Sequence, residues 1–150
     1  TAKELATTQL FDGLSGDDLA AFAGIAQEKS FEPEHVVYET GSAGDSFYVI
    51  IEGSFRVRVA DEHGEEVDVA TLKPGSYFGE MEVIGAINRT AAVISEGDGR
   101  CYRFDAMEVN DLLKRNDTVA AHFYRQVCLV LIRRLKSTTR DVGYFRVRAG

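Results

Sequence analysis

Hydrophobic positions near the start of the chain repeat with the period of an α-helix. Between residues 14 and 27 the apolar side chains return at helical spacing, which is typical of a helix that buries one face. Ser15 precedes this run as an expected N-cap, and Asp17 and Asp18 follow in the first turn, where carboxylates interact favourably with the helix dipole. The pattern predicts a helix in the first part of the chain.

Beyond Pro33 the pattern changes to the alternation that is typical of β-strands. In residues 54–60 apolar and basic residues alternate, which places them on opposite faces of a strand. Turns separate several short runs of Val, Ile, Phe and Tyr; Gly64 lies near the tip of one turn, and Pro74 begins another. We expect strands within residues 35–40, 45–60, 65–72, 90–95 and 100–104.

Helical patterns return at the end of the chain. Asp105 is an expected helix cap with Glu108 in a capping-box position, and a longer helix is expected from Thr118 to about residue 140. The order of elements predicts a mainly β fold, an antiparallel β-roll or jelly roll of about eight strands with an N-terminal helix and two C-terminal helices. We expect one domain over residues 1–150, with a helical part at 1–30, the β-roll at 31–105 and helices at 106–140.

Charge and composition argue against several classes of function. The net charge is −7, with 17 basic and 24 acidic residues, whereas a nucleic-acid-binding surface is usually basic. No apolar run approaches the roughly 20 residues that cross a bilayer, and no signal peptide is found. We therefore expect no direct contact with nucleic acid or membrane and a cytoplasmic location. The first residue is Thr1, which leaves open whether the chain is part of a longer protein.

Cysteine and histidine positions argue against a disulfide, a metal site and an active site. Cys101 and Cys128 lie in apolar runs without CxxC spacing and are predicted to be buried free thiols. His35, His63 and His122 are far apart and lack the spacing of metal ligands. No nucleophile–histidine–acid set stands out, so we expect no metal, no cofactor and no enzymatic activity.

The segment FGEMEVIGAINRTAAV, residues 78–93, carries the candidate chemistry. Glycines bound a short expected helix, and the free backbone N–H groups at the start of a helix attract anions. Gly79 allows close approach of a ligand, Arg89 suits bidentate binding of a phosphate, and Thr90 adds a hydroxyl and an N–H group. Glu80 can accept a hydrogen bond from a ribose hydroxyl, so the segment indicates a ribose-phosphate ligand.

Four motifs together resemble the cyclic nucleotide-binding domain family of the bacterial type. FGEMEVIGAINRTAAV is similar to the family's phosphate-binding cassette. The segments LFDGLSGDDLAAFA, VVYETGSAGDSFYVIIEGSFRV and TLKPGSYFGE are similar to its opening helix, its strand-and-glycine pattern and the turn before the cassette. The resemblance runs in the family's order from Leu10 to Leu135. It implies a β-roll that binds cAMP or cGMP.

The resemblance also assigns roles to individual residues. It implies that Glu80 accepts the ribose 2′-OH and that Arg89 pairs with the cyclic phosphate. Gly79 and the N–H groups near Glu82 and Thr90 would complete the phosphate cage, and a threonine after the arginine favours cGMP. The expected ligand-binding residues are Gly79, Glu80, Met81, Glu82, Arg89, Thr90, Val69 and Leu72, the last two at positions that contact the base.

Glu82 departs from the family pattern, which has a small residue at this position. Like charges ~6 Å apart cost on the order of 2–3 kcal/mol at an effective dielectric near 20, so a second carboxylate beside the phosphate would reduce affinity tens-fold. Glu82 avoids this cost if it points to solvent, the interpretation that we favour, or if it pairs with Arg89 in the empty site. Asn88 stands in place of the family's proline and loosens that turn.

The last helix carries two apolar stripes. The first contains Ala120, Tyr124, Val127, Leu131 and Leu135, and the second contains Val119, Phe123 and Val130. One stripe can pack on the β-roll and leave the other for a partner helix, so we expect a homodimer; both stripes can also be covered within the chain. In the family this helix caps the base, which implies that Arg133 or Arg134 approaches it.

Two functional hypotheses follow. The first is a sensor for cAMP or cGMP that signals through its C-terminal helices to an unidentified effector protein. The alternative is an interaction and dimerisation module that keeps the fold and has lost nucleotide binding through Glu82. A jelly-roll metalloenzyme is disfavoured because the histidine cluster of such enzymes is missing.

Overall fold

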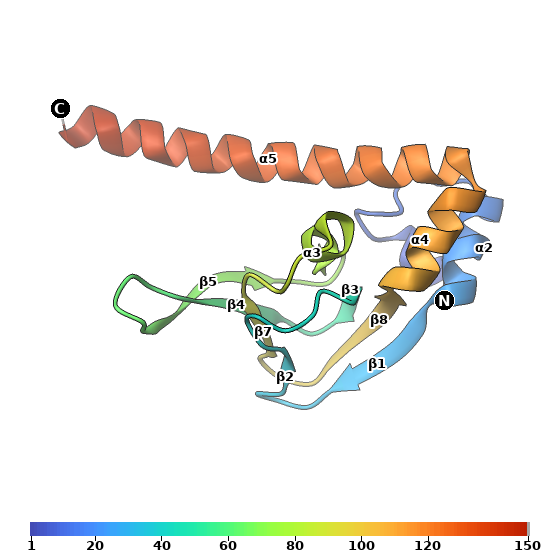
Figure 1. Cartoon of the computed structure of the whole chain (residues 1–150), viewed down its shortest axis with the longest axis horizontal. Helices are drawn as coiled ribbons and strands as arrows, with labels where there is room; N and C mark the ends of the chain where they lie inside the picture. Colours follow the sequence, from blue (N-terminus) through green and yellow to red (C-terminus); the bar gives the residue numbers. More distant parts are fainter. Residues whose placement is uncertain (150) are drawn as a thin grey trace.

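Eight strands form the centre of the computed structural model, which describes the backbone of residues 1–149 and the side chains of residues 1–137 (Figure 1). They are β1 (Gln27–Phe31), β2 (Val36–Tyr38), β3 (Ser46–Glu52), β4 (Phe55–Ala60), β5 (Glu66–Leu72), β6 (Tyr77–Phe78), β7 (Ala92–Ser95) and β8 (Gly99–Asp105). One sheet has the order β1-β8-β3-β6 and the other β2-β7-β4-β5, and all neighbouring strands are antiparallel. The predicted antiparallel β-roll with flanking helices is confirmed.

The strand β1 lies outside the segments in which strands are expected, so the β-roll begins at Gln27 instead of residue 31. All its residues before Phe31 are exposed, and Phe31 itself is half-buried. This strand therefore has no apolar alternation by which a sequence pattern would reveal it. Pairing with β8 along its whole length, from Gln27 opposite Arg103 to Phe31 opposite Gly99, holds it in the sheet.

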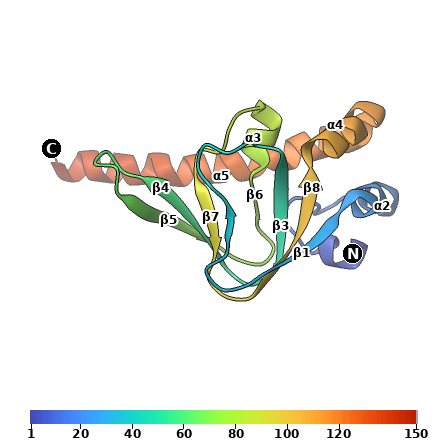
Figure 2. The ribbon, with the colours of Figure 1, turned by 60° about the horizontal axis from the view of Figure 1, so that its bottom comes forward.

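Five helices flank the strands in the described chain: α1 (Ala2–Ala6), α2 (Gly16–Ile25), α3 (Glu80–Gly85), α4 (Ala106–Arg115) and α5 (Asp117–Ala149). Ser15 caps α2 by accepting a hydrogen bond from the Asp18 N–H at 3.3 Å. Asp105 caps α4 by accepting from two N–H groups of its first turn. Both predicted caps are confirmed, and α5 continues past the expected end near residue 140. Figures 1 and 2 show α2, α4 and the first turns of α5 grouped at one end of the β-roll.

Aromatic side chains fill the space between these helices and the sheet that contains β3 and β8. The rings of Phe11 and Phe22 lie 4.8 Å apart, and Phe47 stacks on Phe104 at 4.9 Å. Phe123 of α5 completes the cluster, with its ring 6.0 Å from Phe22 and 5.8 Å from Phe47. The first half of α5 is therefore anchored to the β-roll by close aromatic packing.

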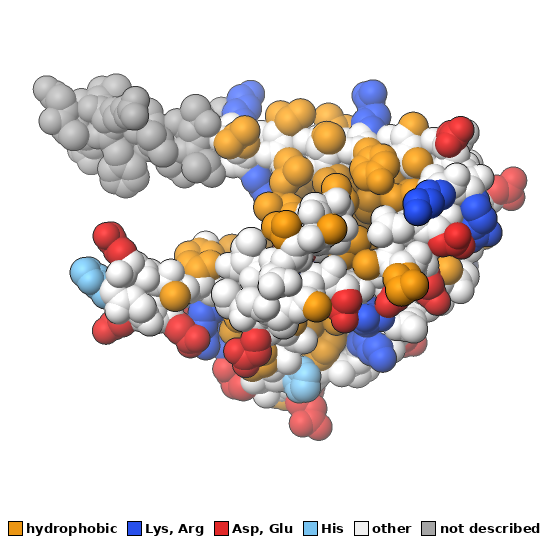
Figure 3. All heavy atoms as spheres, in the orientation of Figure 1, with side chains coloured by type: hydrophobic (Ala, Val, Ile, Leu, Met, Phe, Trp, Pro, Cys, Tyr) orange, Lys and Arg blue, Asp and Glu red, His pale blue; other side chains and the backbone are white. Residues whose placement is uncertain are grey.

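One face of α5 is buried and another is exposed. The buried side chains, each at most 6% exposed, are Val119, Phe123, Val127 and Val130. Tyr124, Ile132 and Leu135 are exposed at 44%, 59% and 67%, and Figure 3 shows hydrophobic side chains gathered along this helix. Val127 thus belongs to the buried face, although it is expected in the stripe with Tyr124.

Cys128 of α5 is exposed too, so the expectation that both cysteines are buried is wrong for Cys128 and correct for Cys101.

The substitution Phe123→Ala should destabilise the protein far more than Met107→Ala, because Met107 is 82% exposed on α4. Truncation of a buried phenylalanine leaves a cavity and costs about 3–5 kcal/mol, whereas an exposed position changes stability by about 0.5 kcal/mol or less. Urea unfolding followed by circular dichroism measures both variants. Equal destabilisation by the two substitutions would contradict the packing of α5 on the β-roll.

Candidate functional site

The cassette, residues 78–93, turns on a glycine in the left-handed conformation. Gly79 has φ 88° and precedes α3, which lies between the strands and α5 in Figure 1. A Cβ at Gly79 would lie 2.7 Å from Nη1 of Arg89 and 3.1 Å from the carbonyl oxygen of Ser46. A larger residue would therefore be strained in its backbone and would also displace these groups. The glycine allows the arginine to lie directly beneath the turn.

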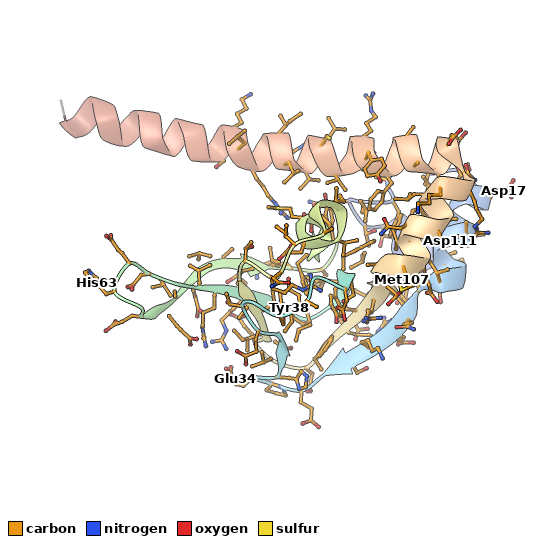
Figure 4. All side chains as sticks on the ribbon, in the orientation of Figure 1. Asp17, Glu34, Tyr38, His63, Met107 and Asp111 are labelled. Carbon is orange, nitrogen blue, oxygen red and sulfur yellow. The ribbon has the colours of Figure 1, made fainter. Side chains whose placement is uncertain are left out.

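Arg89 is almost completely buried, with 2% of the residue exposed. Its guanidinium donates hydrogen bonds to the carbonyl oxygens of Gly79 at 3.1 Å and Ser46 at 2.6 Å. It stacks over the ring of Tyr38, 3.9 Å from the centroid, and pairs with Asp45 at 3.7 Å. Figure 4 labels Tyr38, which extends from β2 below α3. Among the described residues, Nε of Arg89 has no hydrogen-bond acceptor.

The loop between β2 and β3 closes over the cassette. The N–H of Arg89 donates to the carbonyl of Ser42 at 2.8 Å, and the N–H of Gly41 donates to the carbonyl of Arg89 at 2.8 Å. A Cβ at Gly44 would lie 2.6 Å from Cβ of Glu82. The loop therefore packs against α3 so closely that Gly44 has no room for a side chain.

A cavity of about 350 Å³ lies between the cassette, the strands β4 and β5, and α5. Of the expected ligand-binding residues, its wall includes Leu72, Gly79, Glu80, Met81, Glu82 and Thr90. Val69 is 57% exposed on β5 and lies outside this wall, and Arg89 lies beneath Gly79 rather than on the cavity surface. The wall also contains Tyr77, Phe78 and the cation of Arg134, so α5 takes part in the cavity.

Glu80 is a buried acid on this wall, with 2% of the residue exposed. Burial raises the pKa of its carboxyl group above the ordinary value, and the charge of Glu82 adds to this effect. Arg134 opposes it, because its Nη1 lies 3.8 Å from Oε1 of Glu80. The expected ribose acceptor is thus a poorly solvated carboxylate in contact with a cation of α5.

Glu82 is also buried, at 6% exposed, so the expectation that it points to solvent is wrong. Its Oε1 lies 3.5 Å from the backbone N of Thr90, at the limit of a hydrogen bond. Among the described residues, the acid that pairs with Arg89 is Asp45, so the expected pairing of Glu82 with Arg89 is not found. The first turn of α3 therefore directs two buried carboxylates into one cavity.

A family model for the cyclic nucleotide-binding domain matches residues 28–116, which run from β1 to the end of α4. The chain belongs to this family. The match includes the cassette and both sheets, and the resemblance noted in the sequence is confirmed.

Curated relatives of this cyclic nucleotide-binding domain are much longer proteins, and the chain matches only a part of each. A cGMP-dependent protein kinase of Drosophila melanogaster (isozyme 2 forms cD5/T2) is 27% identical over 147 residues, which are 96% of this chain and 16% of the relative. A cAMP-dependent protein kinase regulatory subunit of Mycosarcoma maydis is 33% identical over 95 residues, which are 63% of this chain and 18% of the relative. The chain thus spans less than a fifth of each of these relatives.

Solved structures show the same fold. The catabolite activator protein of Thermus thermophilus superposes with a TM-score of 0.79 and 21% sequence identity, over 92% of this chain and 63% of that one.

In the described part of this cyclic nucleotide-binding domain, no helix is long and apolar enough to cross a membrane. No group of three or more His, Cys, Asp or Glu side chains in those residues is placed to hold a metal ion.

Several residues of the site are missed by sequence reasoning. Tyr38 and Ser46 hold the guanidinium of Arg89 from strands far earlier in the chain, and no local spacing links them to it. Tyr77 also lines the cavity, and its buried hydroxyl has no hydrogen-bond partner among the described residues. Burial also raises the pKa of Tyr77, so the hydroxyl stays protonated and can donate to a ligand.

The substitution Glu80→Gln should stabilise the ligand-free domain at neutral pH. Because the pKa of Glu80 is raised on folding, the unfolded chain loses this proton first, and stability falls as the pH rises from the ordinary value of 4.5 through the raised one. We expect the melting temperature of the variant to exceed that of the wild type by a few degrees at pH 7. Scanning fluorimetry over a pH series should show this difference shrink towards pH 4.5. A less stable variant at pH 7 would instead mean that the contact with Arg134 outweighs the desolvation of Glu80.

Proposed function

We propose that the domain binds cAMP or cGMP in the cavity beside the cassette and acts as a regulatory sensor without catalytic activity. The observation that carries the proposal is the buried pair of unlike charges at one glycine turn: Glu80 on the cavity wall and Arg89 beneath Gly79. A volume of about 350 Å³ is within the usual range for a small-molecule site. Family membership supports a cyclic nucleotide as the occupant.

The Glu80 carboxylate and the Arg89 guanidinium would both interact favourably with such a ligand. A ribose hydroxyl can donate to the Glu80 carboxylate, which lacks water and is disfavoured by burial. A phosphate at the turn would gain the Coulomb attraction of the buried Arg89 charge, which lies beneath Gly79. Thr90 borders the same cavity and favours cGMP over cAMP, because its hydroxyl adds a donor near the base and phosphate.

Signalling would proceed through α5. Arg134 extends from this helix to Glu80, so a ligand that engages Glu80 changes a contact that holds α5 against the cavity. Only a difference in affinity for two arrangements of the helix can shift their equilibrium, and this contact supplies such a difference. The effector would be another protein or a further part of a longer one, and a cytoplasmic location stays a prediction.

Dimerisation through α5 is the second part of the proposal. Ile132 and Leu135 are exposed on this helix, and Tyr124 extends the same apolar surface towards its start. Val130 is buried within the chain and is therefore unsuited to a partner contact. A second copy of the helix would cover the exposed side chains in the manner of a coiled coil.

The alternative is an interaction module that no longer binds a nucleotide. It is favoured by one observation, the burial of Glu82 in the cavity, because a second anionic group there opposes a phosphate. The two functions share the fold and the dimer, and they differ in nucleotide affinity.

Calorimetric titration with cAMP and cGMP should detect binding by the wild type, and Glu80→Gln should weaken it tenfold to a hundredfold. A hydrogen bond to a charged acceptor is worth about 1.5–3 kcal/mol, which corresponds to this loss. Because Glu80→Gln is expected to be the more stable protein, loss of binding cannot be attributed to unfolding. Arg89→Lys keeps the charge without the planar fork and should also weaken binding, provided that its melting curve shows a folded protein. Absence of heat and of thermal shift with either nucleotide at millimolar concentration would favour the interaction module.

Light scattering should report a dimer that the double substitution of Ile132 and Leu135 by Asp converts to a monomer. Burying two carboxylates in an apolar helix interface is strongly unfavourable, whereas exposed positions tolerate them. Met107→Asp is a matched control, since Met107 is 82% exposed on α4 and outside the proposed interface. A monomeric wild type, or a dimer mass that survives the double substitution, would contradict dimerisation through this face.

A further inference from the structure

Glu82 is the feature of the site that the proposed function leaves without a role. Its residue is 6% exposed, it lines the ligand cavity, and Glu80 lies on the same wall. A buried carboxylate is costly unless it accepts hydrogen bonds or pairs with a cation. Its place in the fold therefore requires a compensating contact.

That contact is the backbone N–H of Thr90. Oε1 of Glu82 lies 3.5 Å from this nitrogen, and it is the acceptor that the structure gives to the Thr90 N–H among the described residues. The neighbouring N–H groups already have other partners, since Arg89 donates to Ser42 and Ile87 donates to the carbonyl of Glu82. The carboxylate thus contacts a backbone donor at the point where the cassette enters β7.

The surrounding chain holds the Glu82 side chain in this position. Gly44 in the loop between β2 and β3 approaches so closely that a Cβ there would lie 2.6 Å from Cβ of Glu82. The hydrogen bonds that join Ser42 and Gly41 to Arg89 fix the same loop. Movement of the carboxylate away from Thr90 therefore requires either a new side-chain rotamer within the cavity or an opening of this loop.

The Glu82 carboxylate satisfies the Thr90 N–H only partly. A phosphate offers three or more acceptor oxygens, whereas the carboxylate reaches the Thr90 N–H by a long contact of 3.5 Å. An external anion can therefore offer the Thr90 N–H a shorter hydrogen bond than the internal one does. A competition between the two anions follows from this arrangement.

We propose that the Glu82 carboxylate is an internal occupant of the anion position beside Thr90, and that it competes with the phosphate of a nucleotide for this donor. The competition of Glu82 with a nucleotide phosphate rests on the proposed function, whereas the contact of Glu82 with the Thr90 N–H does not. In this domain the ligand-free cassette is held closed by its own side chain, and a nucleotide binds only at the expense of the Glu82–Thr90 contact. Glu82 is then a residue that sets affinity and disfavours occupancy at low nucleotide concentration.

Amide hydrogen exchange in the ligand-free protein tests the occupancy. Glu82→Ala should accelerate exchange of the Thr90 amide by about threefold to tenfold, because this N–H loses its acceptor. The amides of Arg89 and Ile87 are internal controls, since their acceptors are backbone carbonyls that the substitution leaves in place. Unchanged exchange at Thr90 would overturn the proposal, and so would equal acceleration at all three amides, which would indicate a loosened loop.

Nucleotide titration of the same variants tests the competition. We expect Glu82→Ala to bind cAMP or cGMP roughly tenfold to a hundredfold more tightly than the wild type, and Glu82→Gln to gain less, because glutamine removes the charge and still fills the position. Glu65→Ala removes an equal charge from the exposed β4–β5 turn and should change affinity less than twofold. Equal affinity of wild type and Glu82→Ala would overturn the competition. If neither protein binds a nucleotide, the proposed function fails, and the exchange of the Thr90 amide alone decides the occupancy.

Discussion

Burial of the Arg89 guanidinium is the constraint on which the rest of the site depends. A charged group that is 2% exposed is tolerated only where its donors find acceptors and its charge is compensated. Here the carbonyls of Gly79 and Ser46, the ring of Tyr38 and the carboxylate of Asp45 supply that environment. Ser46 begins β3 of one sheet and Tyr38 ends β2 of the other, so the arginine joins both sheets to the cassette. Position 79 therefore requires a glycine, because any Cβ there would displace the guanidinium.

The sequence predicts the parts of this arrangement that depend on neighbours in the chain. Caps at Ser15 and Asp105 and the glycine-bounded helix of the cassette rest on local spacing, and the structure contains each of them. The strand β1 is missed because its stability comes from pairing with β8 and not from its own pattern. The buried and exposed faces of α5 depend on which side chains meet Phe22 and Phe47, and helical periodicity alone does not determine that.

Burial of the two acids is the part of the site that composition and spacing predict least well. An acid in the first turn of a short helix is usually solvated, and the expectation for Glu82 follows that rule. The structure buries Glu82 because the β2–β3 loop closes against α3 at Gly44, a residue 38 positions earlier in the chain. Only the tertiary arrangement brings these segments together. Likewise, the contact of Arg134 with Glu80 requires the position of α5, which the aromatic cluster around Phe123 determines.

These contacts partly compensate the buried charges of the site within the chain itself. Arg134 partly offsets the burial of Glu80, and the Thr90 N–H contacts Glu82, while Nε of Arg89 has no acceptor among the described residues. Under the proposed function, a ligand with a ribose hydroxyl and a phosphate would exchange these internal contacts for external ones. The net affinity is then a small difference between two similar sets of interactions. Under this proposal, a change at Glu82 would alter the affinity, and a change at Arg134 would alter both the affinity and the contact that holds α5.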